Sequence, residues 1–334
     1  MKRLIAAALL VLTGLCASCA ALPAEERAFA VVLGVGRDGS QWETHARIPT
    51  YQTGGGYMTV SAFGETLSAA LSALDDTAPM HLHLGQLRMV VFSRELAQSP
   101  DFMTALTELS DRQELRLQAA AAVADADLNA LLEAMKPATG ARLSKSLDVL
   151  LDTRIAQGVI MPSQLADVIR MGERQSPVLA AVTLDGQQVD VSGGYPVSQT
   201  GQAGELLSAR DIQLLSMMTG QMSSGTLSLP EGTVRIIAAS SETELTMPAM
   251  QSATARLTLR CDDADMTQEE VSRAAASACL SVLNKLADAN CDALGLGRQA
   301  IRHMTDMTEW HELDWITRYP QIEWAVSVGA QPAA

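Results

Sequence analysis

The sequence predicts an α+β protein of more than one domain, in which mostly antiparallel or mixed sheets are each packed with helices. Two observations carry this prediction. Segments with strand-like alternation and segments with a helical apolar stripe follow one another in the order β-β-β-α-β-α-β-α. The chain has 334 residues, which is enough for two or three domains with cores of their own.

The first residues predict export ahead of this fold. Lys2 and Arg3 precede an apolar run from Leu4 to Leu15, and small residues follow, which is the pattern of a cleaved signal peptide. The apolar run is shorter than the roughly 20 residues that a permanent membrane span requires. We therefore predict that the mature chain lies outside the cytoplasm.

Two cysteines near the end of this signal could accept a lipid. Cys19 follows the small residues Ala17-Ser18, which suits lipoprotein processing, whereas Cys16 follows Leu15. We predict a lipoprotein signal peptide over residues 1–18 and lipidation of Cys19 as an S-diacylglycerol, N-acyl cysteine whose palmitate-like chains anchor the protein stably. The alternative is an ordinary signal peptide that is cut near residues 20–24.

The mature chain is strongly acidic. Loss of Lys2 and Arg3 leaves 22 basic residues against 38 acidic ones, a net charge of about −16. Such a surface repels nucleic acid and anionic lipid headgroups, so we predict no nucleic-acid partner and membrane attachment by the lipid alone. Aromatic residues make up 4% of the chain, too few for a platform on which bases stack.

The stretch from Gly34 to Gly39 matches the G-x-G-x-x-G pattern of dinucleotide sites. Such a site needs a helix directly after the glycine-rich turn. Here Asp38-Gly39 is a hairpin signal, and residues 41–51 alternate like a strand. The stretch therefore predicts strand, tight turn and strand, and we expect no nucleotide cofactor.

Strands and helices alternate in the region that follows the signal. Strands are expected at 28–35, 41–51, 57–63, 86–93 and 114–125, and helices at 65–79, 99–112 and 126–134. The second helix has Ser99 as its cap and Pro100 in its first turn, and Asp125 is expected to cap the third. The expected core faces of the first two helices consist of Leu67, Ala70, Leu71, Leu74, Phe102, Leu106 and Leu109.

The rest of the chain continues the same alternation. Helices are expected at 146–158, 162–172 with Ser163 as cap, and 209–220 with Ser208 as cap, and strands at 176–186, 187–195, 225–232, 233–247, 251–262 and 322–330. A helix-rich segment, 266–304, opens with a Thr267–Glu270 capping box. We expect an N-terminal region over 19–188, with an internal break near 137–160, and a C-terminal domain over 189–330.

The sequence predicts no catalytic, cofactor-binding or metal-ligating residues. The motifs G-x-S-x-G and H-E-x-x-H are absent from the sequence. His81 and His83 would share one face of a strand, but no third ligand is suitably spaced, so we favour two solvated histidines. The Asp262–Asp265 segment lacks the glycine and distal glutamate of a calcium loop and is expected to be a solvated turn.

Three cysteines remain in the mature chain, and their odd number argues against a full disulfide framework. Cys279 could pair with Cys291. Alternatively, Cys279 lies in the core on the apolar face of its helix, and both alternatives stay open.

Motifs along the whole mature chain resemble the Ger(x)C lipoprotein family, the C subunit of the receptors through which spores sense nutrients. The N-terminal motifs are Cys19, Glu25-Glu26-Arg27, Gly34-Val35-Gly36-Arg37-Asp38 and Gly64-Glu65-Thr66-Leu67. The C-terminal ones are Asp292, Gly295, Gly297, Trp310, Trp315 and Tyr319-Pro320. Departures are Ala20-Ala21, where family members often have Trp-Asp, and Gln86, where a His is frequent.

The resemblance implies a non-catalytic, lipid-anchored α+β protein on the outer face of the inner spore membrane. It also implies assembly with the integral-membrane A and B subunits of a germinant receptor. A lipid-anchored solute-binding protein of a transporter is the alternative, and it predicts two lobes with parallel sheets and a ligand cleft. An anchored cell-wall hydrolase is disfavoured because the sequence lacks the corresponding nucleophile and metal motifs.

Overall fold

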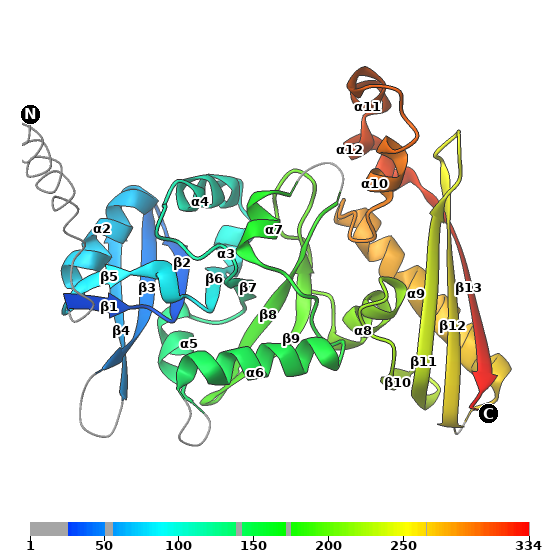
Figure 1. Ribbon diagram of the computed structural model, residues 1–334, viewed down its shortest axis with the longest axis horizontal. Coiled ribbons are helices and arrows are strands. Elements are labelled where there is room, and N and C mark those ends of the chain that lie inside the picture. Colours follow the sequence, from blue (N-terminus) through cyan, green and yellow to red (C-terminus); the bar gives the residue numbers. More distant parts are fainter. Residues whose placement is uncertain (1–25, 51–55, 138–141, 172–174, 265, 334) are drawn as a thin grey trace, which may run out of the picture.

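The computed structural model describes residues 26–50, 56–137, 142–171, 175–264 and 266–333. Its helices pack on mixed sheets, which confirms the α+β fold class. The molecule is elongated, with β1 at one end of its long axis and β13 at the other (Figure 1). A seven-stranded sheet occupies the N-terminal part of the chain and a four-stranded sheet the C-terminal part.

The seven-stranded sheet has the order β4-β3-β2-β6-β7-β8-β9. Its strands are β2 (Val32–Asp38), β3 (Gln41–Thr50), β4 (Gly56–Gly64), β6 (Met89–Ser93), β7 (Ala120–Ala124), β8 (Val178–Asp185) and β9 (Gln188–Pro196). The central strands β2, β6, β7 and β8 are parallel, and the strands at both ends are antiparallel. A separate parallel pair, β1 (Arg27–Phe29) and β5 (His81–His83), lies beside it.

The glycine-rich stretch forms the β2–β3 hairpin that its sequence predicts. Asp38 pairs with Gln41, and Gly39 has a φ of 58°, which a turn of this kind favours. At Gly36 in β2, a Cβ atom would come within 2.9 Å of Leu128 Cδ1 on the packed helix and closer still to the Glu43 carboxylate, so a side chain there would displace both. These glycines thus serve a turn and close helix packing.

One face of the seven-stranded sheet is covered by four helices. They are α2 (Leu67–Thr77), α3 (Arg94–Ala97), α4 (Asp101–Ser110) and α7 (Leu165–Ile169). All seven core residues predicted for the first two helical segments are buried here. A short 3-10 turn, η2 (Leu84–Gln86), leads into β6 on this side.

The opposite face carries α5 (Leu128–Ala134) and α6 (Leu143–Ala156). Leu143 and Leu147 of α6 share one cluster of buried side chains with Val32 of β2 and Val182 of β8. Helix α6, which makes up most of the described part of the 137–160 segment where an internal break is expected, therefore packs against the same sheet as its neighbours. The sheet continues to Pro196 in β9, past the boundary expected at residue 188.

The four-stranded sheet has the order β10-β11-β12-β13. Its strands are β10 (Gly225–Leu229), β11 (Gly232–Leu245), β12 (Ser252–Ala264) and β13 (Glu323–Pro332), and helices α8 (Ala209–Met218) and α9 (Gln268–Asp288) share its core. The first three strands are antiparallel, whereas β13 runs parallel to β12. Ser208 caps α8 as predicted and forms a capping box with Asp211, and Thr267 and Glu270 form the predicted capping box of α9.

A small separate core lies at the end of the four-stranded sheet where β11 and β12 connect. It contains α10 (Leu296–Ile301), α11 (Met307–Leu313), α12 (Trp315–Arg318) and the turn η3 (Tyr319–Gln321). Trp310, Trp315 and Tyr319 are its large buried side chains.

Several details differ from the sequence prediction. The cap of α5 is Asp127 instead of Asp125, because the Asp125 N–H still donates to Val182 in the sheet. Gln164 instead of Ser163 precedes α7. Asp262 lies in β12 opposite Arg235, so the part of the expected solvated turn up to Ala264 belongs to the strand, and Asp265 lies outside the described residues. The strand expected at 114–125 forms only from Ala120 onward.

Candidate functional site

The turn that follows α9 joins the two sheets of the molecule. Its backbone carbonyls at Asn290 and Asp292 accept hydrogen bonds from the N–H groups of Gln199 and Ser176, which belong to the N-terminal part. The Asn290 amide also accepts from the Gln199 side chain at 3.1 Å and donates to the Ile316 carbonyl at 3.0 Å. This turn, residues 290–293, therefore links three separate stretches of the chain.

The Asp292 carboxylate lies at the centre of this turn and is fully buried. Its Oδ1 accepts from the Leu296 N–H at 2.9 Å, and its Oδ2 accepts from the Gly297 N–H at 2.7 Å. The indole Nε1–H of Trp315 donates to Oδ2 at 3.3 Å. The carboxylate thus fixes the start of α10 and the start of α12 at once.

Burial controls the protonation of this carboxyl group. Removal from water raises the pKa of Asp292 to about 6, against the opposing effect of the hydrogen bonds that favour the ionised form. Burial likewise raises the pKa of the adjacent Cys291 thiol and of the Tyr319 hydroxyl. For the Cys291 thiol this direction is opposite to the lowered pKa that activates a cysteine nucleophile.

Aromatic side chains pack around Asp292. The ring centroids of Trp310 and Trp315 are 6.0 Å apart, and those of Trp315 and Tyr319 are 6.1 Å apart. The Tyr319 hydroxyl donates to the Cys291 carbonyl at 2.8 Å. The resemblance thus singled out residues that the fold brings together, although they are separated in sequence.

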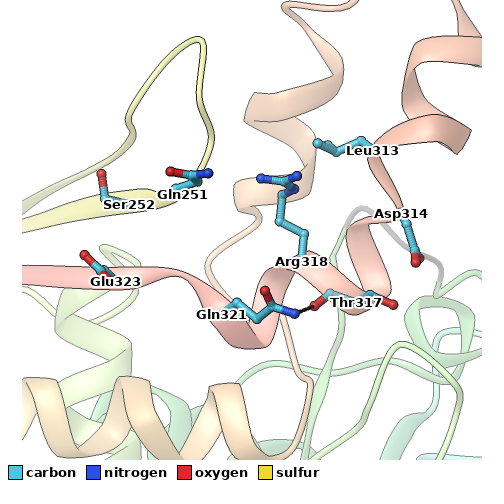
Figure 2. Close-up of a pocket in the computed structure, with 8 residues that line it drawn as sticks. All are labelled: Gln251, Ser252, Leu313, Asp314, Thr317, Arg318, Gln321 and Glu323. Carbon is cyan, nitrogen blue, oxygen red and sulfur yellow. Dashed lines mark hydrogen bonds between the residues drawn. The ribbon is translucent and has the colours of Figure 1, made fainter.

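A polar pocket of about 550 Å³ lies next to this aromatic core. Its lining residues come from the β11–β12 connection and from the segment between α11 and β13, and they are Gln251, Ser252, Leu313, Asp314, Thr317, Arg318, Gln321 and Glu323. Figure 2 shows the Arg318 side chain extending from α12 toward Gln251, while Asp314 points away from Arg318. The Arg318 guanidinium donates to the Ala249 carbonyl at 3.4 Å, which ties the two walls together.

A residue in the left-handed conformation lies in one wall of this pocket, and another directly precedes the other wall. Met250 has a φ of 52° and Asp314 a φ of 48°, and neither is glycine. Such conformations cost about 1–3 kcal/mol each and persist where the surrounding structure enforces them. The pocket offers hydrogen-bond donors and acceptors, but its eight described lining residues include neither histidine nor cysteine.

The other residues that the sequence singled out lie apart from this pocket. Cys19 lies outside the described residues, so its lipidation stays a prediction. His81 lies 3.6 Å from Asp75, and His83 accepts from the Gly85 N–H at 3.1 Å. Among the residues that the structure describes, no cluster of three or more His, Cys, Asp or Glu is placed to hold a metal ion.

The described cysteines, Cys261, Cys279 and Cys291, are free and buried. Of the two alternatives for Cys279, the structure therefore shows a core residue of α9, whose burial raises the pKa of its thiol to about 12. Sequence reasoning missed the polar pocket because its walls are far apart in sequence. The signal that could have found it is the clustering of polar residues after the Trp315 motif.

The comparisons with known proteins agree with these motifs. The family model described as the spore germination protein N-terminal domain matches residues 22–184. The fold is similar to the crystal structure of the GerBC protein, with a TM-score of 0.56 and 12% identity, and the match covers 91% of this chain and 98% of that one. No curated protein matches the chain by sequence.

The family model assigns residues 22–184 to the N-terminal domain of a spore germination protein, and the similar structure supports the fold. This domain, the similar fold and the motifs of the chain together support a Ger(x)C family spore germination protein. In the described part of the chain, no helix has the length and apolar character that crossing a bilayer demands.

Proposed function

We propose that the chain is a lipid-anchored, non-catalytic subunit of a spore germinant receptor and is needed for nutrient-triggered germination. The observation that carries this proposal is the position of the family domain, which begins at residue 22, three residues after Cys19. A lipid on Cys19 would hold this domain against the membrane from its first residues. The proposed location is the outer face of the inner spore membrane.

The proposed partners are the integral-membrane A and B subunits of the receptor. The motif residues support a structural role for the C-terminal part. Asp292 binds backbone N–H groups and an indole, and the neighbouring thiol and phenol have raised pKa values. These contacts hold the turn after α9 against α10 and α12, as expected of a structural core.

The alternative, a solute-binding protein of a transporter, expects two lobes with parallel sheets. The four-stranded sheet is antiparallel from β10 to β12, and the seven-stranded sheet has antiparallel strands at both ends. These antiparallel pairings favour the receptor subunit over the solute-binding protein.

Deletion of the gene, followed by a nutrient germination assay, tests this function directly. We expect deletion spores to respond poorly to nutrients and to recover when the intact gene is restored. An affinity-tagged chain should copurify from spore membranes with two integral-membrane proteins. Normal germination of the deletion strain, or copurification with transporter components instead, would refute the proposal.

A further inference from the structure

A second pocket, of about 190 Å³, lies between α6 and the seven-stranded sheet. Its floor consists of Ala120, Ala122 and Ala180, which lie on neighbouring strands of one sheet face. On the adjacent strand β6, Met89 and Val91 occupy the same face. The alanines therefore leave a hollow that larger side chains fill elsewhere on this face.

Helix α6 forms the wall opposite the floor. Asp148, Leu151, Asp152 and Ile155 line the pocket at spacings of three and four residues, so they lie on one side of the helix. Ile160, which follows α6, adds a further buried apolar side chain. The pocket thus has an aliphatic surface with carboxylates along one edge.

Two buried polar atoms in this pocket have no hydrogen-bond partner among the described residues, namely Arg88 Nε and Ser163 Oγ. The Arg88 carbonyl accepts from the Ala120 N–H at 2.8 Å, and the Ser163 carbonyl accepts from the Ala121 N–H at 3.0 Å. Because successive N–H groups of a strand point to opposite sides, Arg88 and Ser163 flank the start of β7.

Both buried polar atoms without a partner in this pocket can donate a hydrogen bond. Arg88 NH1 lies 3.5 Å from the Asp148 carboxylate, but its Nε–H remains unpaired, and Arg116 contributes a second guanidinium to the lining. Buried donors without acceptors are costly, so a ligand that fits must supply acceptor oxygens. A carboxylate does this best, since guanidinium groups bind it through charge-assisted hydrogen bonds.

We propose that this pocket binds a small carboxylate that carries a short aliphatic chain. The carboxylate is held by Arg88, Arg116 and Ser163, and the chain lies over the alanine floor against Leu151 and Ile155. Pockets for drug-sized ligands measure about 300–1,000 Å³, so this smaller one suits a ligand of only a few carbons. A free carboxylic acid and an α-amino acid share this chemistry, and Asp152 would face the ammonium group of the latter.

This inference does not rest on the proposed germination role, because binding is measured on the chain itself. Ligand-observed NMR on the full chain in detergent would use three probes with one carbon skeleton: 4-methylpentanoate, L-leucine and 4-methylpentanamide. We expect at least one of the two carboxylates to bind and the neutral amide to bind at least about tenfold more weakly. Which carboxylate binds more tightly identifies the source of the ligand.

Two serines provide a matched test of the site. Ser163 and Ser176 both have a buried, unpartnered hydroxyl, but only Ser163 lines the pocket. We expect Ser163→Ala to weaken carboxylate binding about tenfold and Ser176→Ala to leave it unchanged. Ala120→Leu, at a half-buried position of the floor, should abolish binding by filling the hollow.

Three results would overturn the proposal. The first is that neither carboxylate binds to the folded wild-type chain. The second is that the amide binds as tightly as the carboxylates. The third is that both serine variants retain wild-type affinity, because the binding site would then lie elsewhere.

Discussion

Trp315 is the residue whose contribution can be isolated most cleanly. Its indole N–H donates to the buried Asp292 carboxylate, whereas the buried Nε1 of Trp324 has no hydrogen-bond partner among the described residues. We expect Trp315→Phe to lower the free energy of unfolding by about 2 kcal/mol more than Trp324→Phe, because it alone removes a hydrogen bond to a charged group. Urea denaturation of the two variants checks this, and equal losses would contradict it.

Asp292 predicts how stability depends on pH. Its pKa is about 6 in the folded protein, above the ordinary value of 3.8, so the folded state binds this proton more tightly than the unfolded state. Protonation of Asp292 therefore stabilises the folded state by about 3 kcal/mol relative to the ionised form. This contribution to the free energy of unfolding is fully present below about pH 4 and is lost as pH rises through 6.

The variant Asp292→Asn cannot titrate at this position. The unfolding free energy of the wild type minus that of the variant should therefore fall as pH rises from 4 to 7. Urea denaturation at several pH values measures this difference. A difference that is flat or rises with pH would show that burial does not dominate the pKa of Asp292.

For the residues around Asp292, the sequence identified which residues matter but not which of them contact one another. Asp292, Gly295, Gly297, Trp315 and Tyr319 stand out through the family resemblance. Gly295 has a φ of 73°, which explains the glycine there, and Gly297 supplies an N–H to the carboxylate. The acceptor of the Trp315 indole could not be predicted, because it depends on how α12 folds back onto the turn after α9.

At the scale of elements, the start of α5 allows a direct comparison of two neighbouring aspartates. Asp127 Oδ1 accepts from the Ala130 N–H at 2.8 Å, while Asp125 forms an ion pair with Arg94 at a half-exposed site. We expect Asp127→Ala to lower the free energy of unfolding by about 1 kcal/mol and Asp125→Ala by less than about half of that. Thermal or urea denaturation decides, and a larger loss for Asp125→Ala would contradict the assignment of the cap.

The starts of α8 and α9 were predictable, whereas α4 is preceded by Pro100 instead of the predicted cap Ser99. Thr267 with Glu270 and Ser208 cap their helices as expected, because each hydroxyl accepts from an N–H three residues later. Asp125 was misassigned because its own N–H is held by a neighbouring strand, which a single sequence does not show. The direction of β13 was equally hidden, since alternation predicts a strand but not whether its partner is parallel.

At the scale of the whole molecule, the expected fold class was right. The contact between the two sheets, here called the joint, could not be predicted from the sequence. It depends on contacts between residues 175–177 and 290–293, which are far apart in sequence. No periodicity or turn signal encodes such contacts. The joint makes the molecule a single elongated body with β1 near one end (Figure 1).

The central claim is that this body is tethered through Cys19. The variant Cys19→Ala removes the proposed lipid, whereas Cys16→Ala changes the neighbouring cysteine that does not fit lipoprotein processing. Membrane fractionation of both variants, together with a nutrient germination assay, tests the claim most directly. We predict that Cys19→Ala leaves the membrane fraction and germinates poorly while Cys16→Ala behaves like the wild type; unchanged membrane retention of Cys19→Ala would contradict the account.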